Sequence, residues 1–196
     1  MKRTLIAAIA LAMAGTLSSC GDDEPKADPT PTKSASPSSS ATTTPEPTWD
    51  DKYTPAQLQR YRAARDRWLE FWRFYTEAAR KGVDTPGVRS GFEQYSMSPL
   101  GEYSNFLDTY VRGGARMEVA PEVLWTSAAK IGKDTVDFRY CLDNTNIRIT
   151  VDGKVTPQKK PYLVERTIRM RKTSKGWLKE RYLNDEEVKT CTPTAP

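Results

Sequence analysis

The aromatic residues of this 196-residue chain are confined to one part of it. All five Trp, five Phe and nine Tyr lie within residues 49–196, whereas residues 1–48 contain none. Because large apolar side chains supply most of the surface that a fold can bury, a hydrophobic core can form only in the aromatic part. Residues 53–196 are long enough for one domain, and we expect them to form it.

Residues 20–52 are predicted to be a linker. Residues 21–48 consist of small, polar and charged residues and proline, with no aromatic and no large aliphatic side chain. Such a segment buries too little apolar surface to offset its entropy loss on ordering, so we expect disorder. As a flexible coil it would reach about 30 Å. Residues 34–44 are also compatible with O-glycosylation, although a bare spacer is the simpler interpretation.

Residues 1–19 have the pattern of a cleaved export signal. Lys2 and Arg3 form a short positive segment, and an apolar run covers residues 5–14. A transmembrane helix needs about 20 apolar residues, so this shorter run predicts a secretory signal peptide. No later stretch is apolar for more than a few residues, and no membrane-spanning helix is expected after it.

The end of this segment, Leu17-Ser18-Ser19-Cys20, resembles the lipobox of bacterial lipoproteins, in which a branched apolar residue and two small residues precede a cysteine. The resemblance implies that Cys20 is lipidated on its sulfur and becomes the first residue of the mature protein. Two or more acyl chains give firm anchoring, so the expected location is the extracytoplasmic face of the cell membrane. An ordinary signal peptide that ends by chance at a cysteine is the alternative.

Two amphipathic helices are expected at the start of the domain. Thr54-Pro55 is a typical helix start, and Lys81-Gly82 is a typical stop. A second helix is expected over residues 99–111 or 100–111. In the first helix the residues on one face, most of them apolar, recur at spacings of three and four: Leu58, Tyr61, Arg65, Trp68, Trp72, Tyr75 and Ala79.

The apolar period changes to two in the second half of the domain, which indicates strands. Extended segments are expected at residues 117–123, 125–129, 135–142, 147–151, 162–170 and 177–183. Hairpin turns are expected at Asp152-Gly153 and at residues 173–176. Helices followed by a meander of four or five strands predict an α+β fold, with amphipathic helices packed on a curved, cone-like antiparallel sheet.

This order of elements carries a resemblance to a known fold. Two helices followed by a bent antiparallel sheet, with Gly176-Trp177 opening the last strand, resemble the nuclear-transport-factor-2-like cone fold. Residues 55–192 are similar to actinobacterial lipoproteins with such a domain. In those proteins a strand ends in a Cys-x-Asp turn, here Cys141-Leu142-Asp143, and a second cysteine, here Cys191, follows the last strand.

The cysteine count also predicts a disulfide. If Cys20 is lipidated, Cys141 and Cys191 remain as an even pair in an oxidising compartment. A bridge between them would close a loop of about 50 residues, worth roughly 4 kcal/mol in the chain-entropy model. Two free thiols are the alternative.

Few residues are suited to catalysis. The chain has no histidine, which removes His-based triads and most zinc sites, and no glycine-rich phosphate loop or metal-ligand cluster is present. We therefore expect no cofactor and no metal. Enzymes of the cone fold place Asp, His or Tyr in an apolar pocket, so an enzyme here would need a buried carboxylate or Tyr. We favour a non-enzymatic binding or protein-interaction domain, with such a small-molecule enzyme as the alternative.

Seven residues are candidates for a pocket. Arg166 shares a strand face with Val164, and Glu180 shares one with Tyr182, so the two charges could pair inside the sheet and anchor a polar ligand group. A structural ion pair at the sheet margin is the interpretation we favour. The aromatic candidates, which at such spacing more often form core than line a pocket for an apolar ligand, are Trp68, Trp72, Trp125, Phe138 and Tyr140.

Charge bears on the expected partners. Residues 53–196 carry 25 basic and 18 acidic side chains, a net charge of +7. This excess favours anionic lipid headgroups or wall polymers, although scattered basic residues that serve solubility are the simpler interpretation. The partners we expect are the membrane, through Cys20, and an envelope protein, a wall polymer or an apolar small molecule. A homodimer through the open sheet face is a further expectation, and nucleic acid is not expected for an exported domain.

Overall fold

The computed structural model describes residues 48–157 and 162–192. Every described residue belongs to one compact unit, which lies within Thr44–Pro196. The predicted signal peptide, Cys20 and most of the predicted linker lie outside the described residues. None of the described helices combines the length and the apolar character that crossing a membrane requires.

The first helix, α1, spans Pro55–Lys81, as predicted. At its start the Thr54 side chain accepts a hydrogen bond from the Gln57 N–H, and the Gln57 side chain accepts one from the Thr54 N–H. This capping box satisfies two amide donors that the helix cannot pair internally. Gly82 ends the helix in the left-handed region, at a φ of 58°, which glycine adopts without steric cost.

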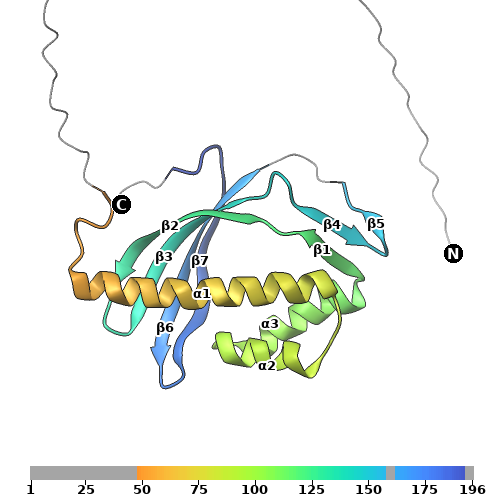
Figure 1. Ribbon diagram of the computed structural model, residues 1–196, viewed down its shortest axis with the longest axis horizontal. Helices are drawn as coiled ribbons and strands as arrows, with labels where there is room; N and C mark the ends of the chain where they lie inside the picture. The colour runs from red at the N-terminus through yellow and green to blue at the C-terminus, as the bar shows by residue number, and fades with distance from the viewer. Residues whose placement is uncertain (1–47, 158–161, 193–196) are drawn as a thin grey trace, which may run out of the picture. The chain divides into compact units, whose positions relative to one another are not determined.

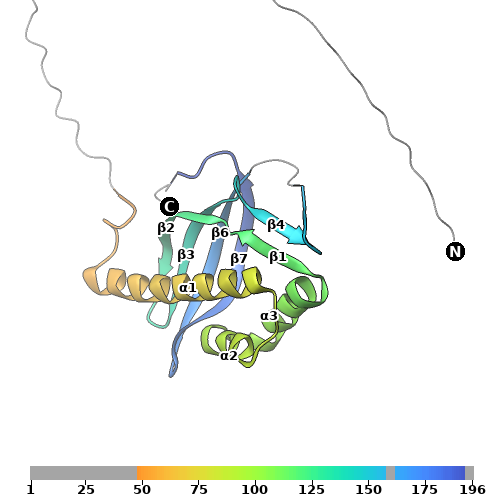
Figure 2. The same ribbon diagram turned by 45° about the vertical axis from the view of Figure 1, so that its right-hand side comes forward.

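Three further helical segments follow α1. Helix α2, Pro86–Tyr95, was not predicted, although Thr85 and Pro86 repeat the start signal of α1. Helix α3 spans Pro99–Phe106 and continues as a π-helix, η1, over Leu107–Arg112, so the second predicted helix is confirmed in extent but changes its winding. Helices α2 and α3 lie together near the C-terminal end of α1 (Figures 1 and 2).

In the part of the chain that the structure describes, seven strands form two antiparallel sheets, one in the order β2-β3-β6-β7 and the other in the order β1-β4-β5. The predicted single meander is wrong, because β4 pairs with β1 instead of staying beside β3. Pro121, which has no N–H for a sheet ladder, separates β1 from β2 where the chain passes between the sheets. The strands are β1 Ala115–Val119, β2 Glu122–Ile131, β3 Thr135–Asp143, β4 Arg148–Val151, β5 Lys154–Val155, β6 Leu163–Thr173 and β7 Gly176–Val188.

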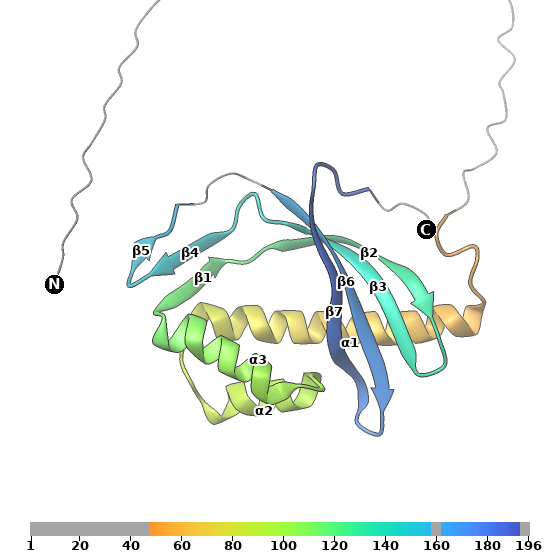
Figure 3. The ribbon, with the colours of Figure 1, turned by 180° about the vertical axis from the view of Figure 1, so that it is seen from behind.

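Both predicted hairpin turns are present. Asp152 and Gly153 join β4 to β5 with φ values of 51° and 75°, the positive values that a two-residue hairpin turn requires. The β6–β7 hairpin closes at Thr173 and Gly176, which are paired across the two strands. Strands β6 and β7 are long and twisted, and they cross the line of α1 (Figure 3).

The main core lies between α1 and the inner face of the four-stranded sheet. As the alternation in β3 predicts, Val136, Phe138, Tyr140 and Leu142 all face inward and are at most 2% exposed. The Trp68 ring lies 4.3 Å from the Tyr140 ring and 5.5 Å from the Phe138 ring, measured between centroids. The α+β fold, with helices packed on one face of a curved antiparallel sheet, is therefore confirmed.

The outer face of the four-stranded sheet is polar and carries the disulfide. Cys141 in β3 is bonded to Cys191, which follows β7, with Cα atoms 6.0 Å apart, so the predicted pair is confirmed. Cross-strand ion pairs also lie on this face. They are Arg169–Asp137 and Arg171–Glu180, each at 2.7 Å, and Arg139–Glu165 at 3.5 Å.

Candidate functional site

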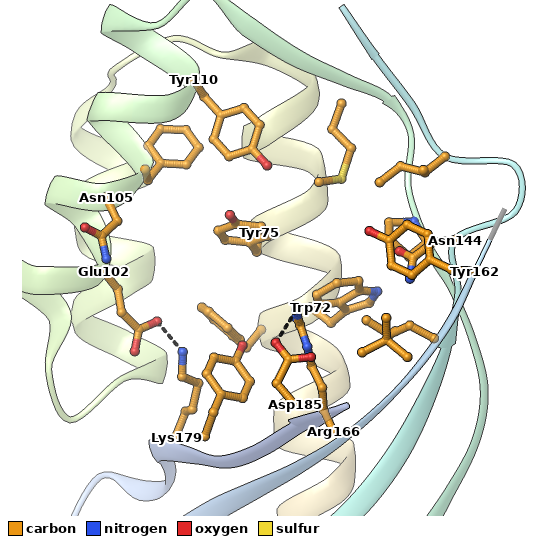
Figure 4. Close-up of a pocket in the computed structure, with 18 of the residues that line it drawn as sticks. Trp72, Tyr75, Glu102, Asn105, Tyr110, Asn144, Tyr162, Arg166, Lys179 and Asp185 are labelled. Carbon is orange, nitrogen blue, oxygen red and sulfur yellow. Dashed lines mark ion pairs between the residues drawn. The ribbon is translucent and has the colours of Figure 1, made fainter. Parts of the chain in front are cut away.

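A cavity of about 600 Å³ lies between the helices and the inner face of the β6–β7 hairpin (Figure 4). Its walls come from the middle of α1, from α3 and η1, from β6 and β7, and from the segment between β3 and β4. Small-molecule sites occupy about 300–1,000 Å³ and are mostly apolar with a few converging polar groups. The cavity has the size of such a site.

Aromatic rings form much of the cavity wall. Trp72 and Tyr75 of α1 stack on each other, with centroids 6.3 Å apart and planes at 19°. Both are only half-buried, unlike Trp68 one turn earlier, which is fully buried. The rings that line the cavity include Phe71, Trp72, Tyr75, Tyr110, Tyr162 and Tyr182.

The π-helix η1 supplies Tyr110 to the cavity. A π-turn holds more residues than an α-turn, so it changes which side chains face the core, and such turns are frequent at functional sites. The Tyr110 ring lies 6.0 Å from the Tyr75 ring. Burial raises the pKa of Tyr75 far above its ordinary value, and the Tyr110 hydroxyl raises it further. Burial also raises the pKa of Tyr110, so both hydroxyls keep their protons at neutral pH.

A buried ion pair joins α3 to β7 at one side of the cavity. Lys179 Nζ lies 2.7 Å from a carboxylate oxygen of Glu102, and the two side chains are 6% and 19% exposed. The Ser96 hydroxyl donates to the other Glu102 oxygen at 2.6 Å. Lys179 Nζ also lies 4.3 Å from the centroid of the Tyr182 ring and 5.1 Å from that of Phe71. These contacts satisfy both charges, so the pair holds the wall in place.

A second ion pair lies at the cavity, between β6 and β7. Arg166 Nη2 is 2.8 Å from a carboxylate oxygen of Asp185, as Figure 4 shows. Burial by itself would lower the pKa of Arg166, but the hydrogen bond to Asp185 and the charges around it reverse the effect and raise it. Arg166 therefore stays a cation within the cavity wall.

Arg166 and Glu180 do not pair, which corrects one prediction. Glu180 is the extra residue of a bulge in β7, because Arg169 pairs with Arg181 and the next residue, Met170, pairs with Lys179. The bulge breaks the alternation on which the prediction depended, and it turns Lys179 into the cavity and Glu180 outward. On the outer face Glu180 binds Arg171, whose hydrogen bond lowers the pKa of the Glu180 carboxyl.

The aromatic pocket candidates divide between wall and core. Trp72 lines the cavity, whereas Trp68, Phe138 and Tyr140 are fully buried in the main core and do not line it. Trp125 pairs with Cys141 across β2 and β3 and so lies on the outer face of the sheet. None of these four residues lines the cavity, so their prediction as pocket residues was wrong. For Trp68, Phe138 and Tyr140 the alternative interpretation, that they form core, was right.

Several residues that line the cavity were not among the candidates. Tyr75 belongs to the predicted helix stripe, so its spacing marked it as inward-facing without showing that the space opposite was unfilled. Lys179 was missed because of the bulge, and Asp185 because β7 was expected to end at residue 183. The residues next to Glu102 in the sequence do not indicate that its carboxylate pairs with Lys179, which lies 77 positions later in the chain.

The cavity offers hydrogen bonds and charge but no isolated acid or base. Glu102 and Asp185 are bound to Lys179 and Arg166, and the third carboxylate of the wall, Glu187, also has an interaction partner. Over residues 48–157 and 162–192, no three His, Cys, Asp or Glu side chains gather closely enough to hold a metal ion. The arrangement is suited to holding a ligand that has an apolar body and polar groups.

No protein-family model matches the chain, and neither does any curated protein. The resemblance to cone-fold lipoproteins therefore stays a prediction.

Proposed function

We propose that this chain is a lipid-anchored, non-enzymatic binding protein of the cell envelope. Its folded domain takes up a small molecule in the cavity between α1, α3 and the β6–β7 hairpin. The observation that carries the proposal is a cavity of about 600 Å³ that is lined by aromatic rings and by two ion pairs, Arg166–Asp185 and Lys179–Glu102. The order of helices and curved sheet agrees with the cone-fold resemblance, which is part of the same proposal.

The state of the carboxylates favours binding over catalysis. A catalytic acid or base needs a carboxyl group free to exchange a proton near neutral pH. Glu102 is held by Lys179 and Ser96, and Asp185 is held by Arg166. The tyrosines keep their protons, because burial raises the pKa of Tyr75 and of Tyr110. Fixed donors and paired charges orient a ligand without transforming it.

The amino-terminal sequence supports the location. The charged start, the short apolar run and the resemblance to a lipobox around Cys20 support a location on the extracytoplasmic face of the membrane. A polar linker of about 30 Å reach would let the domain meet small molecules or wall components near that surface. Substituting Cys20→Ala should abolish incorporation of radiolabelled palmitate and release the protein from the membrane fraction. Unchanged labelling would contradict the lipobox assignment.

Binding can be tested by filling the cavity. The protein is exported without lipid, as the chain from residue 20 with Cys20→Ser, and purified without detergent. Native mass spectrometry should then find a small molecule bound at a stoichiometric level. Ile147→Trp places an indole in the cavity and should abolish this adduct, whereas Val155→Trp, an apolar-to-Trp change at an exposed position of β5, should retain it. Equal occupancy in both variants, or no adduct in the wild type, would contradict the proposal.

A further inference from the structure

We propose that the ligand of this cavity is an amphiphile with an oxyanion head group, which Arg166 binds in place of Asp185. The proposal rests on the proposed function, because it names the ligand class for the same cavity. A carboxylate, a sulfonate or a phosphate would share this chemistry.

Two buried polar groups beside the cavity lack a well-formed hydrogen bond among the described residues. The Nε of Arg166 and the hydroxyl of Tyr140 are shielded from solvent, and neither has a hydrogen-bond partner in good geometry, although the Tyr140 hydroxyl lies near the Arg166 guanidinium and the Tyr182 hydroxyl. The two residues are direct cross-strand partners on β3 and β6. Buried donors without acceptors are rare in native proteins, because each one costs about 1–3 kcal/mol. An oxyanion brought by a ligand would supply acceptors where the protein has an excess of donors.

Asp185 is a replaceable partner for Arg166. Its side chain is 56% exposed on the edge strand β7, whereas that of Arg166 is 30% exposed. When Asp185 leaves, water solvates its carboxylate at once, so exchanging it for a ligand oxyanion costs little. The Lys179–Glu102 pair differs, because both of its side chains are mostly buried and Ser96 holds Glu102 as well. Arg166 is therefore the cation of the wall that can change partners.

The other charges near the cavity permit an anion. Glu102 is paired with Lys179, and Glu187 takes part in an interaction of its own. The net charge of +7 on residues 53–196 attracts anions to the domain as a whole. The rings of Trp72, Tyr75 and Tyr110 would cover the apolar part of the ligand.

The test compares three probes with the same eight-carbon chain: octanoate, octanol and octyltrimethylammonium. Each is titrated calorimetrically into the lipid-free chain from residue 20 with Cys20→Ser, which keeps every described residue. Octanoate should bind at least tenfold more tightly than octanol, and octyltrimethylammonium most weakly. Arg166→Met should remove the preference for octanoate, whereas Arg169→Met, the same change on the outer face of β6, should leave it intact. Asp185→Asn should tighten octanoate binding severalfold, and Glu186→Gln, next to it on β7, should not.

The results distinguish a failure of the oxyanion inference from a failure of the proposed binding function. If octanol binds as well as octanoate, or if Arg166→Met keeps the preference, the oxyanion inference is overturned while the binding function stands. If octyltrimethylammonium binds most tightly, the ligand is a cation and the inference is again overturned. If none of the three probes binds and no adduct is found by mass spectrometry, the proposed function itself fails. Circular dichroism of every variant establishes that the fold is retained.

Discussion

The two halves of α1 carry similar aromatic residues but meet different surroundings. Toward the N-terminal end, Tyr61 and Trp68 pack on Phe138 and leave no space, and we call this region the closed end. From Trp72 onward the helix faces the β6–β7 hairpin across the cavity, and we call this region the open end. Trp68 and Trp72 are one turn apart and stacked, with centroids 5.9 Å apart, yet only one of them is core.

The difference comes from the strands opposite the helix. At the closed end β3 presents large apolar side chains that fill the space. At the open end β6 and β7 present Arg166 and Lys179, whose charges are held at the wall by Asp185 and Glu102. Charged side chains resist collapse onto apolar rings, because burying an unpaired charge costs several kcal/mol. An aromatic stripe on a helix therefore marks its inward face, and the strand opposite decides whether that face forms core or lines a pocket.

The largest expected effect separates Trp68 from Trp72. Trp68→Ala should lower the free energy of unfolding by about 3–5 kcal/mol, because it leaves a cavity in a filled core. Trp72→Ala should lower it by less than half as much, because the Trp72 side chain is half-buried beside existing space. Urea unfolding followed by circular dichroism measures both. Equal losses would show that the two ends do not differ in packing.

The second-largest effect is expected from the disulfide. It joins Cys141, on the outer face of the sheet, to Cys191, which follows β7, the strand that lines the open end. Cys191→Ala should lower the free energy of unfolding by about 2–4 kcal/mol, because the loop of the unfolded chain is no longer closed. Wild-type protein treated with a reductant is the control and should show the same loss. A change below about 1 kcal/mol would mean that the tail after β7 contributes little to the fold.

Alkaline pH should destabilise both ends through their tyrosines. Burial raises the pKa of Tyr140 well above its ordinary value near 10, and the nearby Arg166 offsets only part of this. Because the unfolded chain loses its tyrosine protons first, stability is fully present below pH 10 and falls above it, by about 1.4 kcal/mol per pH unit for each such tyrosine. Tyr140→Phe removes one of these tyrosines, so the loss of stability above pH 10 should become less steep by about 1.4 kcal/mol per pH unit.

The same variant gives a second measurement at neutral pH. The Tyr140 hydroxyl has no hydrogen-bond partner among the described residues, so its removal should change the free energy of unfolding by less than about 1 kcal/mol. Tyr61→Phe is the matched control at the closed end. It breaks the bond from the Tyr61 hydroxyl to Thr126 Oγ1, 2.7 Å long, and should cost about 1 kcal/mol. A steeper alkaline slope in Tyr140→Phe would contradict the assignment.

The smallest effect is expected at Glu180, which lies outside both ends. Glu180→Gln breaks an ion pair with Arg171, whose side chain is 41% exposed, so the loss in unfolding free energy should stay below about 1 kcal/mol. Octanoate affinity should be the same as in the wild type. A large drop in affinity would place Glu180 at the cavity after all and overturn the role of the bulge.

Local signals in the sequence were sufficient for most of the fold. The cap at Thr54, the stop at Gly82 and the alternation in β3 are properties of neighbouring residues, and each predicted its element correctly. The start of α2 at Thr85-Pro86 carried the same kind of signal and could have been found. The disulfide followed from the cysteine count together with the predicted compartment.

Most residues of the candidate site could not be predicted from local sequence patterns. The bulge at Glu180 shifts the alternation of β7 by one residue, and no local pattern in 176–188 announces it. The contacts of Lys179 with Glu102 and of Tyr75 with Tyr110 depend on how distant elements pack. Sequence periodicity therefore located the inward faces, whereas the space between them could be seen only in three dimensions.

Ligand binding at the open end of α1 can be observed at the tryptophan indoles. Trp72 lines the open end, Trp49 packs on Tyr61 at the closed end, and Trp125 lies on the outer face. In ¹⁵N–¹H correlation spectra with octanoate added to saturation, the indole signal of Trp72, assigned with Trp72→Phe, should move the most. The signals of Trp49 and Trp125 should stay in place. Shifts of Trp49 or Trp125 equal to that of Trp72, or no shift at Trp72, would contradict the account.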